Sequence, residues 1–403
     1  MSGSGASRGA DAPRVALLTY STRPRGGVVH SLNLAEALRA LGEPVHLFAL
    51  GDPETGFFRP TSVPHTIVPA PPPAATLEER VLDSMSALFE HLATALPGSF
   101  DIVHAQDCIA ARAATDLRDA GSGIPVIRTV HHVDDFTTRV LVDCQRRSIV
   151  SPDRTLVVSE YWRALLREQH GVEATVVTNG VDAERFRRPG EFDGSILRER
   201  VGADGRFLFL TVGGIEPRKG SIELVEALAK VGASIDPPPV LAVVGGQSFQ
   251  DYADYRERFF ERAAALGLEV GRDVVLLGTV SDDELPGWYQ AADAFVFPSV
   301  KEGWGLVVLE ALAAGLPVIT SDIAVFREYL TDGEGALMVP AGDATALAEE
   351  MRRVASDADL RSRLAAAGPA VAGRYTWEAC ARRHAEIYRE VAAPIRPRPI
   401  GPR

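Results

Sequence analysis

Short apolar runs alternate with amphipathic stretches of helical length along nearly the whole chain, and this alternation constrains the fold more than any other feature. The first runs are RVALLTY (14–20) and PVHLFAL (44–50), with a helical stretch through Leu41 between them. Alternating strands and helices are typical of a parallel sheet wrapped by helices, so the pattern predicts the α/β class. In the first half we expect further strands at 101–104, 125–130, 155–158 and 174–177, and helices at 76–95, 107–120 and 159–169.

The alternation is interrupted by a charged segment at 184–205 and restarts with RFLFLTV (206–212). A chain of 403 residues is too long for one typical core and long enough for two. We therefore expect two α/β domains, at 13–183 and 206–374, with 184–205 as the linker between them. The polar start (1–12) and the proline-rich end (396–403) are expected to be disordered tails. In the second half the expected strands are 239–245, 274–278, 294–298, 317–320 and 336–339, and the expected helices are 219–231, 251–266, 281–291, 306–314, 343–356, 357–372 and 375–391.

The chain is acidic, with a formal net charge of −12 from 54 acidic and 42 basic residues. This excess argues against non-specific nucleic-acid binding and against docking on anionic membranes, because both need a basic face. Cys108, Cys144 and Cys380 have neither the spacing of a disulfide framework nor that of a metal site. No apolar run approaches the roughly 20 residues of a membrane-spanning helix. We therefore expect a cytoplasmic protein.

The segment KEGWGLVVLEALAAG (301–315) is the strongest functional motif in the chain. Glu302 lies in a loop after an apolar strand, and a helix is expected to begin near Leu306. Gly303 and Gly305 leave backbone amides uncovered, and a helix N-terminus with bare amides is an anion site suited to a diphosphate. Glu310, about one turn inside the helix, is placed to bind a diol, whereas Glu302 would reach a part of the ligand beyond the phosphates. The layout therefore predicts a nucleotide-sugar site.

Together with AADAFVFPS (291–299) before it, this segment resembles the E-x7-E motif of family 4 retaining glycosyltransferases, the glycosyl transferases group 1. The similarity covers nearly the whole chain, is closer in the C-terminal half, and includes HAQD (104–107), TVHH (129–132), TNGVD (178–182) and EPRKG (216–220). The resemblance implies the GT-B fold, with two Rossmann-like domains facing a central cleft and the donor bound in the second. It also implies that the last helix crosses back, so that 375–395 joins the first domain.

The resemblance assigns further residues to the donor. Lys219 matches a lysine that contacts the leaving diphosphate. The family usually has an arginine five residues earlier, where this chain has Gly214, so either Arg218 supplies the missing charge or phosphate binding is weaker. His131 ends a strand, where it is expected to face the cleft, and it matches a histidine beside the donor sugar. Gly27 belongs to a loop that approaches the donor phosphates in the family.

These assignments give a site in four parts. The expected catalytic residues are His131, Lys219 and Glu302. The expected diphosphate-binding residues are Gly27, Arg218, Lys219, Gly305, Leu306 and Val307. The expected sugar-binding residues are His131, Glu302, Gly303 and Trp304. The nucleoside is expected to contact Glu310 and a strand edge that binds the base in the family, namely Thr279 and Val280.

No Asp-x-Asp motif follows a strand, so we expect no metal ligand, no cofactor and metal-independent transfer. The expected reaction moves a sugar, with retention, from a UDP- or GDP-linked donor to an acceptor hydroxyl. The acceptor is expected to contact variable loops of the first domain, among them the proline-rich connection 51–75. Two alternatives remain: a GT-B nucleotide-sugar epimerase, and a binding protein with a degenerate site. A dehydrogenase is disfavoured because the chain has no G-x-G-x-x-G fingerprint.

Overall fold

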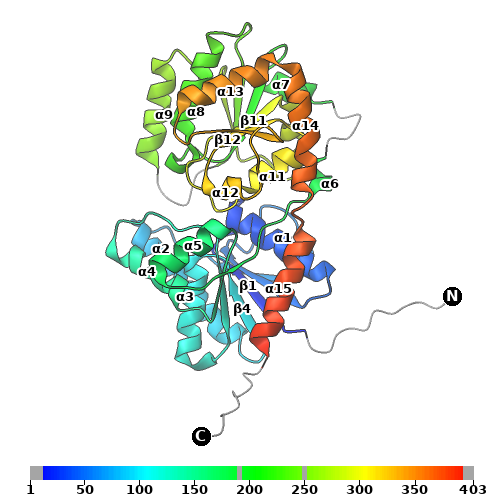
Figure 1. Cartoon of the computed structure of the whole chain (residues 1–403). Helices are drawn as coiled ribbons and strands as arrows, with labels where there is room; N and C mark the ends of the chain where they lie inside the picture. The colour runs from blue at the N-terminus through cyan, green and yellow to red at the C-terminus, as the bar shows by residue number, and fades with distance from the viewer. Residues whose placement is uncertain (1–11, 188–192, 247–251, 394–403) are drawn as a thin grey trace, which may run out of the picture. The chain divides into compact units, whose positions relative to one another are not determined.

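The computed structural model describes residues 12–187, 193–246 and 252–393 (Figure 1). Apart from residue 12, the tails that the sequence predicts to be disordered lie outside these described residues. None of the described helices is both long and apolar enough to cross a membrane.

The first sheet has seven parallel strands in the order β3-β2-β1-β4-β5-β6-β7. Its central strands are almost completely buried, in keeping with a parallel sheet covered on both faces. The strands are β1 (Val15–Thr19), β2 (Val45–Gly51), β3 (His65–Pro69), β4 (Ile102–Ala105), β5 (Val126–Val130), β6 (Arg154–Val157) and β7 (Thr175–Val176). The helices around it are α1 (Gly26–Ala40), α2 (Leu77–Ala95), α3 (Cys108–Leu117), α4 (Arg139–Val150), α5 (Glu160–His170) and α15 (Trp377–Ala392).

The second sheet has six parallel strands in the order β10-β9-β8-β11-β12-β13. The strands are β8 (Leu208–Val212), β9 (Val240–Val244), β10 (Val274–Gly278), β11 (Ala294–Phe297), β12 (Val318–Ser321) and β13 (Ala336–Val339). The helices that follow β7 in the chain are α6 (Ala183–Phe186), α7 (Ser195–Arg200), α8 (Ser221–Gly232), α9 (Ala253–Ala265), α10 (Leu285–Ala291), α11 (Leu306–Ala313), α12 (Ala324–Arg327), α13 (Ala344–Ser356) and α14 (Ala358–Ala372). The α/β class and the two Rossmann-like domains expected from the sequence are confirmed.

In both sheets the strand order reverses beside the first strand of the domain. β1 pairs with β2 on one side and β4 on the other, and β8 pairs with β9 on one side and β11 on the other. At such a switch point the loops leaving the two central strands turn to opposite faces of the sheet, which leaves a crevice suited to a ligand. In the second domain this crevice is therefore flanked by the loops after β8 and β11, which carry Lys219 and Glu302.

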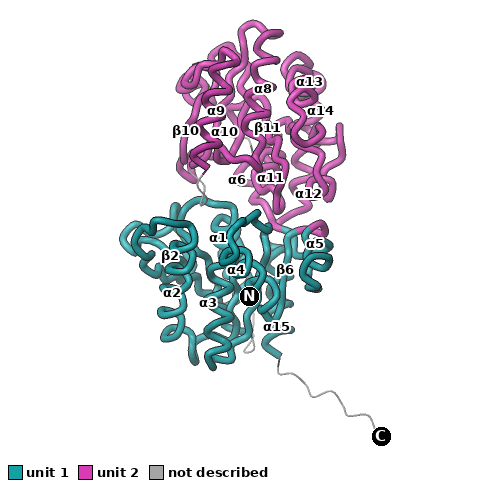
Figure 2. Tube along the Cα trace, turned by 90° about the vertical axis from the view of Figure 1, so that its left-hand side faces the viewer, with its two compact units in different colours: residues 1–158, 162–178, 377–403 teal, residues 159–161, 179–376 magenta. Residues whose placement is uncertain are grey.

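The chain divides into two compact units (Figure 2). The first takes in Met1–Val158, Trp162–Thr178 and Trp377–Arg403, and the second takes in Ser159–Tyr161 and Asn179–Thr376, as far as these ranges are described. The last helix, α15, packs on α1 and β4 and so belongs to the first unit, as the family resemblance implied.

The segment expected to be a linker, 184–205, is part of the second unit. Phe186 is buried, with its ring edge-on to Tyr289 at 5.5 Å. Arg198 donates hydrogen bonds to the carbonyl of Ala291 at 2.8 Å and to the carboxylate of Asp293 at 3.0 Å. The helices in this segment are four and six residues long, and they are anchored mainly by polar contacts. This explains why the segment has no apolar run in the sequence.

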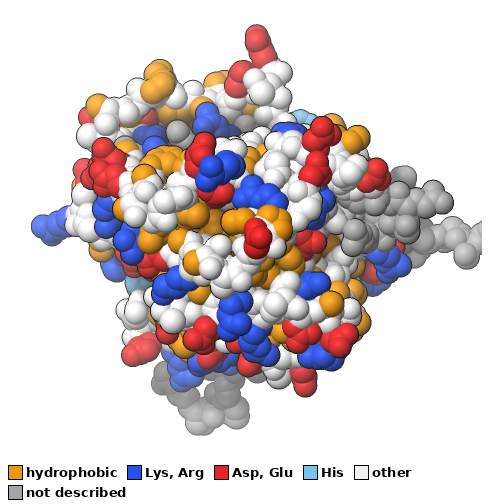
Figure 3. All heavy atoms as spheres, turned by 90° about the horizontal axis from the view of Figure 1, so that it is seen from above, with side chains coloured by type: hydrophobic (Ala, Val, Ile, Leu, Met, Phe, Trp, Pro, Cys, Tyr) orange, Lys and Arg blue, Asp and Glu red, His pale blue; other side chains and the backbone are white. Residues whose placement is uncertain are grey.

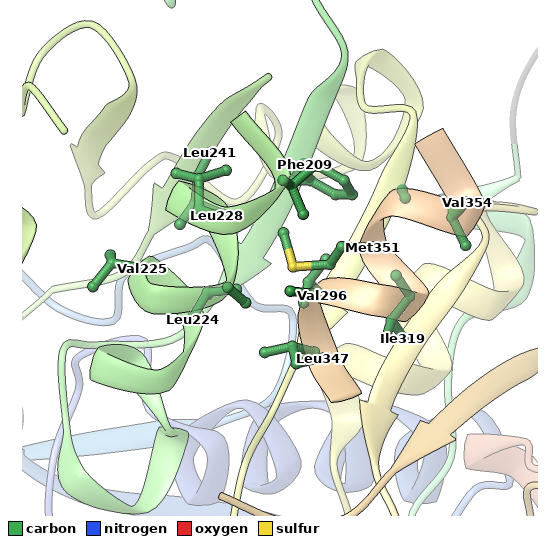
Figure 4. Close-up of a cluster of buried hydrophobic side chains, with 14 of the residues drawn as sticks. Phe209, Leu224, Val225, Leu228, Leu241, Val296, Ile319, Leu347, Met351 and Val354 are labelled. Carbon is green, nitrogen blue, oxygen red and sulfur yellow. The ribbon is translucent and has the colours of Figure 1, made fainter. Parts of the chain in front are cut away.

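The second unit is built around a dry core of aliphatic and aromatic side chains. Residues from β8, β9, β11 and β12 pack against those of α8 and α13, among them Phe209, Leu224, Val296, Ile319 and Met351 (Figure 4). Full burial of one such side chain contributes roughly 1.5–3 kcal/mol. This core fixes where β8 and β11 end, and thereby fixes the loops that follow them.

Charged side chains of both signs are interspersed over the face drawn in Figure 3. Among the described residues, oppositely charged side chains pair within single helices, such as Arg353 with Glu350 on α13 and Arg382 with Glu378 on α15. Exposed pairs of this kind contribute about 0–1 kcal/mol each. They matter for solubility more than for the choice of fold.

Candidate functional site

A buried cluster of opposite charges lies at the switch point of the second sheet. One oxygen of Glu302, Oε1, is 2.5 Å from Nζ of Lys219 and 3.2 Å from Nη1 of Arg218. The hydroxyl of Ser299 donates a hydrogen bond to the same oxygen at 2.7 Å. Nε of Arg218 also lies 2.8 Å from the carboxylate of Glu216. The structure therefore brings together three residues that the sequence had placed in the site, Arg218, Lys219 and Glu302.

The cations decide the ionisation of Glu302. Burial alone would raise the pKa of this carboxyl, but the charges of Lys219 and Arg218, with the hydrogen bonds from Lys219 and Ser299, lower the pKa to about 2. Burial and the neighbouring Arg218 lower the pKa of Lys219, while Glu302 opposes this effect. The site thus holds a carboxylate anion at any physiological pH, with two cations beside it.

Backbone contacts hold the two loops of this cluster together. The carbonyl of Arg218 accepts a hydrogen bond from the amide of Val300 at 2.8 Å, and its oxygen lies 2.7 Å from the hydroxyl oxygen of Ser299. Gly220 has a φ of +65°, and a Cβ at this position would lie 2.3 Å from the carbonyl oxygen of Pro298. Only glycine permits this approach. The loops after β8 and β11 are consequently one rigid platform for the charged cluster.

The helix α11 begins beside this platform. Its N-cap, Gly305, has a φ of +87°, and a Cβ there would lie 2.6 Å from the ring of Phe326. The amides of Val308 and Leu309 both bond back to the carbonyl of Gly305. The first amides of a helix have no partner within it, so those of Leu306 and Val307 remain available to an anion. The diphosphate role of Gly305, Leu306 and Val307 stays a prediction.

Two more residues of the segment 301–315, Gly303 and Trp304, were expected to bind the sugar. Gly303 is half-buried in the loop between Glu302 and the helix. Trp304 is only 3% exposed, with its ring 4.9 Å from Tyr329 and 5.3 Å from Tyr375. Its carbonyl accepts a hydrogen bond from the Tyr329 hydroxyl at 2.9 Å. The indole of Trp304 therefore contributes to loop packing, and a sugar contact would have to come from the backbone or after a local rearrangement.

Gly214 stands in a crowded turn. A Cβ at this position would lie 2.8 Å from the carbonyl oxygen of Gly246, and a Cβ at Gly245 would lie 2.5 Å from the backbone of Gly213. An arginine at 214 would therefore require the loops after β8 and β9 to separate. Gly213 and Gly214 also line a hollow beside Lys219 and Phe297. On the same loop, Nη1 of Arg218 lies 3.2 Å from Glu302, and that Arg218 supplies the missing charge stays a prediction.

Glu310 lies on α11 and is already engaged by a tyrosine. The hydroxyl of Tyr289 donates a hydrogen bond to its Oε2 at 2.8 Å. Burial raises the pKa of Glu310 to about 7, although the Tyr289 hydrogen bond and the charge of Arg185 oppose the rise. Among the described residues, Oε1 of Glu310 makes no hydrogen bond, and the diol contact expected of Glu310 stays a prediction. The loop after β10, with Thr279 and Val280, packs on the β9 loop, since a Cβ at Gly246 would lie 2.5 Å from Oγ1 of Thr279.

Replacing Glu310 with glutamine is expected to stabilise the protein more at pH 8 than at pH 5. The carboxyl has a pKa of about 7 in the folded chain and 4.5 in its ordinary state, so folding favours the protonated form. That contribution is complete below pH 4.5 and is lost as the pH rises through about 7, whereas an amide undergoes no such loss. Thermal unfolding of both proteins at the two pH values measures the difference. Glu349→Gln, at an exposed position of α13, is the control. An equal change in melting temperature at both pH values would contradict the raised pKa of Glu310.

In the first unit, Gly27 follows β1 and His131 follows β5. Gly27 opens α1, and a Cβ there would lie 3.9 Å from Cδ2 of His131, so the two expected residues are neighbours. Asp107 ties the loops together, because its carboxylate accepts hydrogen bonds from the amides of Tyr20 and Ala110, both at 2.8 Å. Burial and the nearby Arg128 lower the pKa of His131 well below 6.5, so its ring is neutral at pH 7.

Sequence reasoning missed several polar partners of these residues. Ser299 follows its strand directly and lies three residues before Glu302, so its position after a buried strand was a usable signal. Gln106, whose Oε1 lies 3.0 Å from Nε2 of His131, also follows a strand. Tyr289 gave no such signal, because it lies in an ordinary helical segment and its partner Glu310 is 21 positions away. Glu216 lies in a turn only two positions before its partner Arg218, and its residue type alone does not mark the pair.

Comparison with known proteins gives matches over both units. The profile of the Glycosyl transferases group 1 matches residues 195–371, and that of Glycosyltransferase Family 4 matches residues 24–185. The chain is 30% identical to phosphatidyl-myo-inositol mannosyltransferase of Mycobacterium leprae over 384 residues, covering 93% of this chain and 95% of that protein. It is 28% identical to D-inositol 3-phosphate glycosyltransferase of Streptomyces bingchenggensis over 418 residues, covering 94% and 89% of the two chains.

Solved structures give the same result for the fold. Sucrose-phosphate synthase of Thermosynechococcus elongatus superposes with a TM-score of 0.77 at 23% identity, covering 94% of this chain and 99% of that one. HepE of Anabaena, solved in complex with UDP and glucose, superposes with a TM-score of 0.76 at 19% identity, covering 93% and 99%. At these identities the likeness establishes the architecture.

Proposed function

Because the chain belongs to the group 1 glycosyltransferases of family 4 and has the GT-B fold, we propose that it moves a sugar from a nucleotide diphosphate sugar to an acceptor hydroxyl, with retention at the anomeric carbon. The observation that carries this proposal is the buried cluster of Lys219, Arg218 and Glu302 beside the first amides of α11. Such a cluster offers positive charge to a diphosphate and a carboxylate to sugar hydroxyls within one small region.

The proposed mechanism follows from these charges. When the bond from the anomeric carbon to the diphosphate breaks, negative charge grows on the phosphate oxygens, and Lys219, Arg218 and the amides of Leu306 and Val307 stabilise it. Glu302 holds sugar hydroxyls rather than attacking the sugar. The acceptor attacks from the face that the phosphate leaves, and a leaving phosphate oxygen takes the acceptor proton. We infer that no metal and no cofactor are required, since these groups supply the positive electrostatics.

The base, the sugar and the acceptor are proposed only as classes. The donor is UDP- or GDP-linked, with Glu310 on the ribose and the loop of Thr279 and Val280 at the base. The names of the relatives, an inositol lipid mannosyltransferase and an inositol phosphate glycosyltransferase, favour a polyol hydroxyl as the acceptor. The acceptor would contact loops of the first unit.

A panel of nucleotide sugars and free nucleotides tests the proposal. A ligand bound to the native state raises the melting temperature, so one base and one sugar should stand out. The best donor should then give a glycosylated product with a polyol acceptor, in the presence of EDTA as well as without it. Product formed from the donor alone would identify an epimerase instead.

A degenerate binding protein is the second candidate, and Gly214 is the observation that favours it. This reading predicts a shift in melting temperature without turnover of any donor. Turnover of any donor would contradict this reading, and Arg218 would then be the residue that supplies the missing charge.

A further inference from the structure

We propose that the ring of Phe297 is the floor on which the ammonium group of Lys219 rests, so that Phe297 is a positioning residue for the charge assigned to the donor diphosphate. Phe297 is the last residue of β11, and Lys219 lies in the loop after β8. The contact therefore joins the ends of the two strands that border the switch point of the second sheet. The role of Lys219 toward a diphosphate rests on the proposed function, whereas the contact itself does not.

The lysine side chain is held along its whole length. Its Nζ lies over the Phe297 ring, 4.4 Å from the ring centroid, and 2.5 Å from Oε1 of Glu302. Its stem passes close to the backbone of Gly213, since a Cβ at that glycine would lie 3.5 Å from Cε and 3.7 Å from Cδ of Lys219. Only 13% of the lysine side chain is exposed. The ammonium group therefore has little room to leave the ring.

The ring is fixed as well. Phe297 is 1% exposed, its ring is stacked with that of Phe295 at 5.8 Å between centroids, and the ring of Phe326 lies 6.3 Å away. The carbonyl of Phe297 accepts a hydrogen bond from the hydroxyl of Thr320 at 2.8 Å. The face of an aromatic ring is the negative part of its quadrupole, so a ring held in this way presents a constant partial negative charge to Lys219.

Lysine is a rare residue in this chain, and its chemistry suits this position. Of the 42 basic residues only three are lysines, namely Lys219, Lys230 and Lys301. An ammonium group is a compact charge that fits between one ring and one carboxylate, whereas the guanidinium of arginine is a planar fork. Burial and the charge of Arg218 lower the pKa of Lys219, and the carboxylates beside it, those of Glu302 and Glu216, oppose this effect. The ring adds a further electrostatic attraction for the charged form.

The contact should matter most when the site is occupied. The attraction between a cation and an aromatic face grows when the cation is desolvated, and a bound diphosphate would cover the part of Lys219 that is still exposed. The ring would then favour the centred, charged lysine more strongly in the complex than in the free protein. A lysine that had to leave the ring to reach the phosphates would give the opposite result, because the ring would then oppose binding.

Fluorinated phenylalanines at position 297 of the full chain test the contact directly. Mono-, di- and trifluorophenylalanine weaken the negative face of the ring stepwise, while the ring keeps its shape and nearly its volume. Carbon-13 labelling of lysine gives only three sets of side-chain signals, and Lys219→Met assigns the one that titrates at position 219. We expect the pKa of Lys219 in the ligand-free protein to fall with each added fluorine, because the charged form loses its attraction to the ring. A pKa that stays constant across the series would overturn the contact.

Binding and turnover test the positioning role. In the trifluorinated protein we expect the affinity for UDP or GDP, and kcat/KM with the best donor, to fall on the order of 10-fold, with the alkaline limb of kcat/KM moved to lower pH.

Phe209→Leu is the control, because it removes a buried ring from β8 in the core of the same unit (Figure 4). It should lower the melting temperature but leave the pKa of Lys219 and the diphosphate affinity unchanged. Tighter diphosphate binding in the fluorinated proteins would show that Lys219 leaves the ring on binding, and would overturn the positioning role. If the pKa series behaves as expected but no nucleotide binds and no donor is turned over, the proposed function fails and the contact stands.

Discussion

Glu302→Ala is expected to reduce sugar transfer by a factor on the order of 10²–10³, the usual effect of removing one preorganised group that acts in the transition state. Glu302 is the common acceptor for Lys219, Arg218 and Ser299, so its loss disorganises the cations as well as the proposed sugar contact. Steady-state turnover with the best donor measures the effect. Glu269→Gln, which removes an exposed pair with Arg272, is the matched control and should leave turnover unchanged.

The same variant has a second expected signature in stability. Breaking a buried ion pair by removing one partner costs about 3–5 kcal/mol, because the other charge stays buried. The pKa of Glu302 is lowered from 4.5 to about 2, so the stability from the ion pair is fully present above pH 4.5 and is lost as the pH falls through about 2. Glu302→Ala should therefore melt at a lower temperature than the wild type at pH 7, with the gap narrowing only in strong acid. Wild-type transfer in this variant would refute the donor-site assignment.

Lys219→Met is expected to reduce turnover by a similar factor and, in addition, to abolish the preference for nucleoside diphosphates over monophosphates. The lysine reaches Glu302 from a loop beside the first amides of α11, where a diphosphate gains most from a positive charge. Methionine keeps the volume of the side chain and removes the charge. Calorimetric titration with UDP, UMP, GDP and GMP measures the preference.

The control for this variant is Lys230→Met, because Lys230 is on α8 and bonds at the surface to Thr345. Lys219 and Glu302 are in direct contact, so the double variant Lys219→Met, Glu302→Ala should lose less than the sum of the two single losses. Additive losses would mean that the two residues act separately.

The central strands and the donor motif were predictable because each is local in sequence. The run VVLLG gave β10 with its observed bounds, and the two glutamates of the segment 301–315 lie in the predicted loop and helix. β3 was not predicted: it is an edge strand, HTIVP, in which only Val68 is buried, so it has no apolar run. The helix α4 was also missed: Val140, Val142 and Val150 are exposed beside its four charged residues, so its sequence does not separate a polar from an apolar face cleanly.

Other contacts of the site could not be predicted, because they join distant parts of the chain. Arg218 and Glu302 are 84 positions apart, and Tyr289 and Glu310 lie 21 positions apart on different helices. The ionisation of the site could not be predicted either. From sequence alone Glu310 is expected to be ionised at pH 7, but burial in the folded chain raises its pKa to about 7 against the opposing effect of the Tyr289 hydrogen bond.

The place of α15 in the first unit also bears on how the protein is made on the ribosome. The core of the first unit includes Ala381, Ile387 and Tyr388, which are translated after the whole of the second unit. The second unit is almost entirely one continuous stretch, Asn179–Thr376, and all of it has been synthesised before α15 begins. Nascent domains usually fold from the N-terminus onward. Here the domain that begins first is completed only after the second unit has been synthesised, and until α15 is made the surfaces of α1 and β4 that it covers are exposed to chaperones.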